Sequence, residues 1–198
     1  MARTQAADYD QRREGIVAAA AELYARRGFL GASIADLAQA CGSSKSLIYH
    51  YFSAKEDILF EVMASHIEEL RAAVREVEAS PAPPADKLRD LARRFMALYA
   101  GAAARQKVLL NELGHLPPTR RDEIVSWQRE LVSAVELLLT RLRPALADRP
   151  GGARPIALLF FGMINWTHTW YDPAGPAAPD AIADAAVDLV LGGLPALL

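Results

Sequence analysis

The stretch "CGSSKSLIYHYFSAKED", residues 41–57, sets a run of small polar residues directly ahead of an aromatic cluster. Gly42 follows one short amphipathic segment, and Ser44 stands where it would cap a second, which ends near Phe52. A glycine turn between two short helices is typical of a helix-turn-helix motif. We therefore expect the second of these helices to lie in a groove of DNA.

The residues before this stretch supply the rest of the motif. Apolar residues recur at helical spacing within residues 16–24, which predicts a first helix over about residues 9–27, with Gly28 ending it. Ser33 precedes Asp36 by three residues and marks the start of the second helix. Three short helices thus form a small N-terminal core.

Beyond the motif the chain predicts further helices and no strand. Ser53 with Glu56 predicts a capping box at the start of a long fourth helix, and the Pro-rich residues 80–86 end it. We predict an all-α protein of about nine helices. Residues 1–55 are expected to form the DNA-binding domain, and residues 56–198 a helical bundle for ligand binding and dimerisation. The later helices are predicted over residues 85–103, 106–113, 119–147, 156–171 and 181–192.

Composition limits the classes of protein that this chain can represent. About half of its residues (52%) are apolar and 23% are charged, which is ordinary for a folded globular protein. Its longest apolar run, residues 156–171, contains polar residues and is shorter than the roughly 20 residues of a membrane span. One cysteine, Cys41, excludes an internal disulfide, and the polar N-terminus suggests no export, so a cytoplasmic protein without membrane contact is expected.

Charge is distributed unevenly along the chain. Residues 1–55 hold seven Lys and Arg against five Asp and Glu, a net charge of +2, whereas the whole chain has −2. The N-terminal part is therefore the one expected to face a polyanion.

On the third predicted helix, Ile48, Tyr51 and Phe52 are expected to turn inward. Two outward strips remain, each made of residues four apart: Lys45 with Tyr49, and Ser46 with His50. Lysine can donate to guanine or to phosphate, and hydroxyl groups suit phosphate oxygens. The alternative is a helix face that is only solvated.

Residues 9–60 resemble the DNA-binding domain of the TetR family of bacterial transcriptional regulators. The pattern includes Gly28, Gly42, Lys45 and Tyr49, while Leu47 replaces a small polar residue and is expected to contact a thymine methyl group. The resemblance implies a homodimer whose third helix reads the major groove of operator DNA and whose C-terminal domain binds an inducer. The residues expected to contact DNA are Ser33, Ser44, Lys45, Ser46, Leu47, Tyr49, His50 and Lys55.

The C-terminal part suggests the class of inducer. Residues 161–176, "FGMINWTHTWYDPAGP", resemble a segment of TetR-family regulators that respond to acyl-coenzyme A thioesters in fatty-acid, aromatic-acid and sterol breakdown. An apolar cavity with one amide suits such a ligand, and basic side chains at its mouth suit the phosphates of coenzyme A. The predicted cavity residues are Phe95, Tyr99, Trp127, Phe161, Asn165 and Trp166, and the predicted basic residues are Arg105, Lys107, Arg120 and Arg121. The alternative is that the former only fill the core and that the latter are only solvated.

The last two predicted helices are candidates for the dimer interface. The helix over residues 156–171 is apolar on more than one face, and the last helix has apolar residues at helical spacing with alanines that permit close approach. Two such helices from each chain would form a four-helix interface. The alternative is that these residues only fill the core of their own chain. The predicted interface residues are Trp170, Ile182, Ala185, Ala186, Leu189 and Val190.

Other functions have weaker support. A repressor of an efflux pump that senses hydrophobic drugs is the nearest alternative, and a helical enzyme acting on acyl-CoA is a more distant one. His66, His115 and His168 do not have the spacing of a metal site, and His168 is expected to be a hydrogen-bonded core residue. With no catalytic motif and no phosphate-binding glycine loop, we expect no enzyme activity, no metal and no cofactor.

Overall fold

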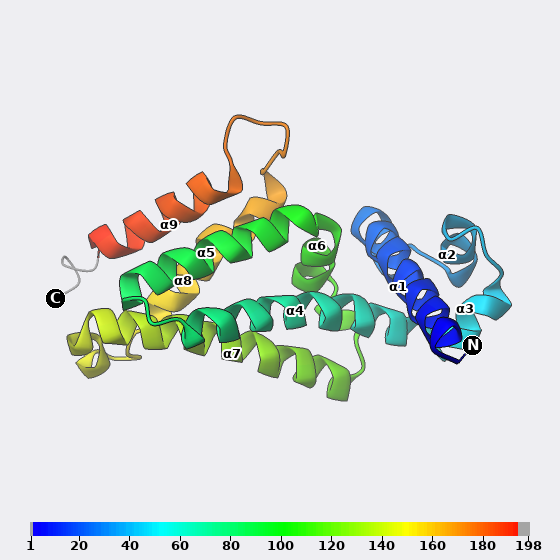
Figure 1. The fold of residues 1–198 in the computed structure, drawn as a ribbon, viewed down its shortest axis with the longest axis horizontal. Helices are drawn as coiled ribbons and strands as arrows, with labels where there is room; N and C mark the ends of the chain where they lie inside the picture. Colours follow the sequence, from blue (N-terminus) through cyan, green and yellow to red (C-terminus); the bar gives the residue numbers. More distant parts are fainter. Residues whose placement is uncertain (1, 194–198) are drawn as a thin grey trace. The chain divides into compact units, whose positions relative to one another are not determined.

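The computed structural model is all-α, as predicted, with nine α-helices and three short 3-10 helices in the residues it describes, 2–193 (Figure 1). Side chains are described from residue 9 onward. The α-helices are α1 (Ala2–Arg27), α2 (Ile34–Ala40), α3 (Lys45–Tyr51), α4 (Lys55–Ala79), α5 (Pro84–Gly101), α6 (Ala103–Asn111), α7 (Pro118–Leu142), α8 (Arg154–Asn165) and α9 (Pro179–Gly193), and the 3-10 helices are η1 (Leu113–His115), η2 (Pro144–Asp148) and η3 (Trp166–Thr169).

The chain packs as two units. The first contains residues 1–66 and 104–124, and the second contains residues 67–103 and 125–198. The first unit therefore holds α1 to α3 together with α6, η1 and parts of α4 and α7. The predicted division near Lys55 stays a prediction about function, since these units reflect packing alone.

In the first unit, local hydrogen bonds define the short helices. The Ser33 hydroxyl accepts from the Asp36 amide at 3.1 Å, and the Asp36 carboxylate accepts from the Ser33 amide at 2.8 Å, so a complete capping box starts α2. Gly42, with φ of +57°, makes the turn that follows α2. Ser44 then caps α3 by accepting from the Leu47 amide at 3.2 Å.

The start of α4 differs from the prediction by one residue. The helix begins at Lys55, so Ala54 precedes it, and the Ala54 amide donates to Asp57 Oδ2 at 3.0 Å. Asp57 thus takes the part predicted for Glu56. The reason is register: the third residue of the helix, which can reach back to the capping amide, is Asp57.

A buried polar pair joins α4 to α6 within the first unit. His66 is fully buried, and its Nε2 lies 2.9 Å from Oε1 of Gln106, which is buried as well. Because an amide oxygen only accepts, the proton of this bond is on Nε2. The pair satisfies two polar groups that would otherwise destabilise the core.

In the second unit, α5 and α9 pack along each other, and α8 also contacts α9. Phe95 is the largest fully buried side chain of α5, and α9 turns Ala183, Ala186, Val187 and Val190 inward. Apolar spacing of this kind is what allows one face of a helix to be buried.

Helix α7 is shorter than predicted. It ends at Leu142, and residues 144–148 form η2, whereas the sequence pattern predicted a helix to residue 147. Pro144 lacks an amide hydrogen and disfavours the helical conformation of the residue before it, so the α-helix cannot continue.

Helix α8 also ends early, at Asn165 and not at residue 171. Thr167, His168 and Thr169 each bond to a backbone carbonyl oxygen three residues earlier, at 2.6, 2.7 and 2.8 Å. Polar side chains that bond to nearby backbone compete with a regular helix, and η3 results. His168 is therefore hydrogen-bonded, as predicted, although it is only half-buried. Among residues 2–193, no helix is both long and apolar enough to cross a membrane.

Candidate DNA-binding and ligand-binding sites

Helix α3 presents one face to solvent and holds the other in the core. Ile48 is fully buried and Phe52 is nearly so, while Tyr49 is 54% exposed. Lys45, Ser46 and His50 are exposed as well. The two outward strips are therefore accessible, as DNA contact requires, and their contacts with DNA stay a prediction.

The predicted serines have structural bonds of their own. Ser44 is exposed and accepts a hydrogen bond at the start of α3, while the Ser33 hydroxyl donates to the Asp36 carboxylate. Leu47 is half-buried. A serine cap of this kind stabilises the first turn of α3, because it satisfies a backbone amide that has no partner within the helix.

Lys55 lies in a different environment from Lys45. Its Nζ donates to the carbonyl oxygen of Phe29 and lies 3.9 Å from the centre of the Phe29 ring and 5.8 Å from that of Tyr24. Burial lowers the pKa of Lys55, against the nearby carboxylates that raise it. Lys55 thus joins the start of α4 to the turn after α1, and its phosphate contact stays a prediction.

Sequence reasoning missed Tyr9, which brings an aromatic ring from α1 to α3. The Tyr9 ring centre lies 4.6 Å from that of Tyr51 and 6.3 Å from that of His50, and His50 lies 5.2 Å from Tyr51. We call these three side chains the aromatic trio. No motif in the sequence signals such a contact, because Tyr9 and His50 are far apart in the chain.

In the second unit, three of the predicted cavity residues come together. Phe95 stacks on Tyr99 with ring centres 6.2 Å apart, and Phe161 lies 5.9 Å from Phe95. All three are buried. The three rings form an aromatic cluster between α5 and α8, and their contact with an inducer stays a prediction.

The other three predicted cavity residues lie in different settings. Trp127 is half-buried beneath the guanidinium group of Arg71, whose Cζ is 5.3 Å from a Trp127 ring centre. Asn165 is half-buried at the end of α8, and Trp166 is 64% exposed beside His168. Trp166 therefore lies on the surface of this single chain, and its contact with an inducer stays a prediction.

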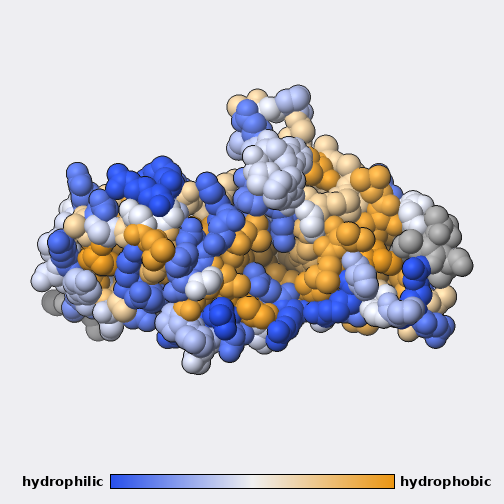
Figure 2. Space-filling view, turned by 180° about the vertical axis from the view of Figure 1, so that it is seen from behind, coloured by the Kyte–Doolittle hydropathy of each residue, from blue (hydrophilic) through white to orange (hydrophobic). Residues whose placement is uncertain are grey.

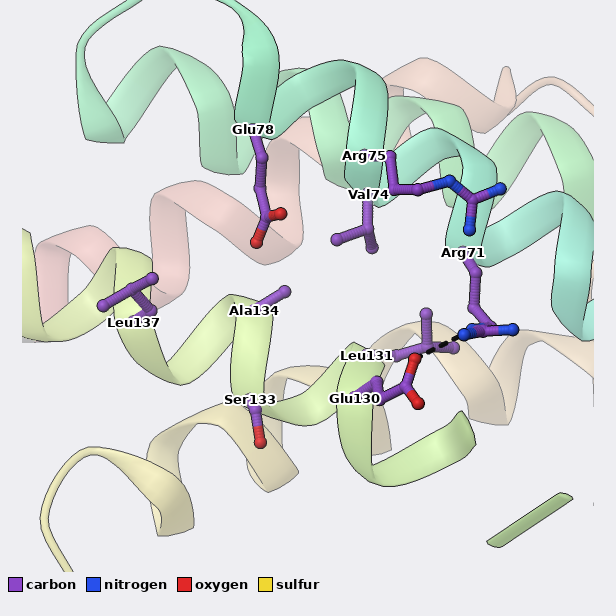
Figure 3. A pocket seen from close by; sticks show the side chains of 9 residues that line it. All are labelled: Arg71, Val74, Arg75, Glu78, Glu130, Leu131, Ser133, Ala134 and Leu137. Atoms are coloured by element: carbon purple, nitrogen blue, oxygen red, sulfur yellow. Dashed lines mark hydrogen bonds and ion pairs between the residues drawn. The ribbon is translucent and has the colours of Figure 1, made fainter. Parts of the chain in front are cut away.

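An open groove of about 350 Å³ lies between α4 and α7 in the second unit (Figure 3). Arg71 and Arg75 stand at one side of it, and Arg71 donates to Glu130 across the groove at 2.8 Å. The sequence pattern did not predict this groove. Its lining residues are Arg71, Val74, Arg75 and Glu78 from α4, and Glu130, Leu131, Ser133, Ala134 and Leu137 from α7.

The basic residues predicted to bind coenzyme A phosphates belong to the first unit, whereas the aromatic cluster belongs to the second. Arg105 pairs with Glu14, and Arg120 lies 4.2 Å from the Phe60 ring centre and 3.5 Å from Glu123. Carboxylates thus already compensate these guanidinium groups. Of the remaining two, Arg121 lies 3.7 Å from Asp122 and Lys107 is exposed.

The predicted dimer residues divide into two sets. Trp170, Ala185 and Leu189 are exposed and Ile182 is half-buried, whereas Ala186 and Val190 are buried in their own chain. Ala186 and Val190 lie on the face that α9 packs within its own unit, whereas the exposed residues remain available for an interface, which stays a prediction. Leu158 and Leu159 of α8 add exposed apolar surface, and apolar side chains gather where α8 lies in Figure 2.

An ionic network fastens α9 to α5. Arg93 donates to both carboxylate oxygens of Asp184, at 2.8 and 2.7 Å, and Arg89 bonds to Asp184 at 3.1 Å and also to Asp188. The hydrogen bonds from Arg93 are the main cause that lowers the pKa of Asp184 to about 2. The outward face of α9 is thus held in a defined direction.

Comparison with known proteins identifies both parts of the chain. Residues 16–62 match the family model described as "Bacterial regulatory proteins, tetR family". Residues 81–194 match "Tetracyclin repressor-like, C-terminal domain".

Individual relatives extend over nearly the whole chain. A TetR-family transcriptional regulator from Bordetella parapertussis 12822 has a crystal structure with 39% identity and a TM-score of 0.87, covering 94% of this chain and 97% of that one. The structure of AibR in complex with isovaleryl coenzyme A and operator DNA has 27% identity and a TM-score of 0.79, covering 90% and 97%. The transcriptional repressor KstR2 of Rhodococcus jostii (strain RHA1) is 27% identical, over 92% of this chain and 91% of that protein.

These matches agree with the geometry of α3, whose polar face is exposed while Ile48 on the opposite face is buried. The family consists of transcriptional regulators and not of enzymes. The chain belongs to the TetR family of DNA-binding transcriptional regulators.

Proposed function

We propose that the protein is a repressor that binds a palindromic operator as a homodimer and leaves it when an acyl-CoA thioester binds. The observation that carries the proposal is the geometry of α3, where Lys45, Tyr49 and His50 stand exposed while Ile48 is fully buried. The site of action is then the cytoplasm, where DNA is available. Repression itself is supported by relatives such as KstR2 of Rhodococcus jostii.

The homodimer is supported by exposed apolar side chains on α8 and α9. Leu159 and Leu189 are 69% and 68% exposed in the single chain, and Trp170 is 54% exposed. A symmetric dimer would cover these side chains and present two copies of α3. To read successive major grooves, the two helices must lie about 34–36 Å apart or at a multiple of one DNA turn.

An acyl-CoA inducer is supported by two observations. The buried rings of Phe95, Tyr99 and Phe161 offer apolar surroundings for an acyl group. The structure of AibR, a relative of this chain, contains isovaleryl coenzyme A.

Release from DNA requires that the inducer bind the released conformation more tightly than the DNA-bound one. The ratio of these two affinities limits how far the inducer can shift the equilibrium. An inducer that binds both conformations equally would leave the operator occupied.

Fluorescence anisotropy of a labelled duplex, taken from the DNA upstream of the protein's own gene, tests the proposal. The complex is titrated separately with isovaleryl-CoA, palmitoyl-CoA, phenylacetyl-CoA, the matching free acids, coenzyme A alone and a cationic dye. Release by at least one thioester, with no release by its free acid, is the expected result. Release by the dye alone would instead identify a sensor of hydrophobic drugs.

A further inference from the structure

The aromatic trio places Tyr9 of α1 against the exposed end of α3. His50 meets Tyr9 and Tyr51 edge-on, with interplanar angles of 78° and 84°, while Tyr9 and Tyr51 are tilted by 40°. Tyr9 is 41% exposed and His50 is also exposed. The imidazole ring is thus restrained on two sides without being buried.

Arg13, one helical turn after Tyr9, fixes the position of α1. Arg13 donates to both carboxylate oxygens of Glu61, at 2.9 and 2.6 Å, and its Cζ lies 5.0 Å from the centre of the Phe52 ring. Residues four apart on a helix share one face, so Tyr9 and Arg13 point to the same side of α1. This face of α1 is therefore fastened to the end of α3 and to α4 by two contacts.

An exposed histidine normally samples several rotamers, and a bound one must adopt a single rotamer. Ordering a side chain on binding reduces affinity, and a neighbour that selects the bound rotamer in advance removes this loss. Edge-to-face contacts between aromatic rings have a preferred geometry and can make that selection.

We propose that Tyr9 is a positioning residue of the DNA interface, which holds the imidazole of His50 in the direction needed to bind DNA. Tyr9 acts in this way only if α3 reads DNA through His50, as proposed above. The ring, and not the hydroxyl group, is the part that acts. The interface then depends on a residue of α1 that lies outside the helix-turn-helix.

A double-mutant cycle between Tyr9→Ala and His50→Ala tests the proposal. Binding is measured by fluorescence anisotropy on a duplex selected from random sequence by the wild-type protein. We expect Tyr9→Ala to weaken binding about three- to tenfold in the wild-type background and to have almost no effect beside His50→Ala. Tyr9→Phe should bind within about twofold of wild type, since the ring remains.

A second cycle is the matched control. Lys45 lies at the opposite end of α3 from His50, so Tyr9→Ala and Lys45→Ala should weaken binding additively. Tyr9→Leu keeps apolar packing without the ring, and it should bind as weakly as Tyr9→Ala even if the alanine variant is less stable. Circular dichroism and urea unfolding of each variant separate loss of structure from loss of positioning.

Three outcomes would overturn the assignment of Tyr9. Losses that add between Tyr9 and His50 would show that Tyr9 does not act through His50. A Tyr9→Phe variant as weak as Tyr9→Ala would point to the hydroxyl group. A wild-type protein that selects no duplex would overturn the proposed function as well, whereas the first two results would leave that function standing.

Discussion

Lys45 and Lys55 lie close in sequence, but the structure gives their charges different environments. Lys45 is exposed, whereas Lys55 bonds to the Phe29 carbonyl and lies over the Phe29 ring. We expect Lys55→Ala to lower the free energy of unfolding by about 1 kcal/mol, since it loses a charge-assisted hydrogen bond and a cation–π contact. Lys45→Ala should leave the unfolding free energy unchanged within about 0.5 kcal/mol. Urea denaturation of both variants checks this.

Lys45 is also the residue that salt dependence tests best. If it binds a phosphate, Lys45→Ala should reduce the slope of log affinity against log salt by about 0.9 on any duplex. The same titration on Lys55→Ala shows whether Lys55 contacts phosphate despite its internal bond. An unchanged slope in the Lys45 variant would exclude a contact between Lys45 and a phosphate.

Gln106 supplies the partner of the buried His66 Nε2–H group. Gln106→Leu should lower the free energy of unfolding by about 1–3 kcal/mol, because a buried donor loses its acceptor. Lys107→Ala, an exposed change on the same helix, is the control and should have an effect within about 0.5 kcal/mol. Equal stabilities of the two variants would mean that the His66–Gln106 bond contributes nothing.

At the scale of helices, the Arg89–Asp184–Arg93 network should stabilise the protein in a pH-dependent way. The pKa of Asp184 is lowered from 3.8 to about 2, so the contribution is fully present above pH 3.8 and is lost as pH falls toward 2. We expect Asp184→Asn to unfold at lower urea than wild type at pH 7, and this difference to shrink at pH 3. Because the network is exposed, high salt should also weaken it. A difference that grew as pH fell would contradict this assignment.

Helix boundaries show where the sequence was sufficient and where it was not. Ser33 with Asp36 and Ser44 ahead of α3 were predicted correctly, since a cap depends on residues three apart. The predicted end of α8 was wrong. Apolar spacing alone indicated a longer helix, but the side chains of Thr167, His168 and Thr169 bond to the backbone and end it. Tyr9 was missed for a different reason: its contact with α3 is tertiary and leaves no periodic signal.

For the whole molecule, the sequence pattern could not show which face of α9 is buried and which is exposed. Ala186 and Leu189 both fit an apolar helical pattern, yet Ala186 is buried and Leu189 is 68% exposed. Only the packing of α5 against α9 decides which face remains for a partner. Phe95 and Phe161 are large and apolar, so both are expected to be buried, but the pattern of residues 156–171 is apolar on more than one face and does not show that these rings meet. Their contact with an inducer stays a prediction.

Leu189 gives the most direct test of the proposed homodimer. Leu189→Arg should shift the protein from dimer to monomer in sedimentation-velocity experiments, because a charge would have to be buried in an apolar interface. Leu30→Arg is the matched control, since Leu30 is 77% exposed and lies in the first unit. A wild-type protein that sediments as a monomer at micromolar concentration would contradict the dimer.

Two copies of α3 are proposed to bind one duplex. Sedimentation velocity of the wild-type protein with a fluorescent duplex selected by the protein, at low and at high salt, measures this stoichiometry. We predict one complex with two chains per duplex at low salt and its dissociation as salt rises. Free duplex at every protein concentration, even at the lowest salt, would contradict the claim.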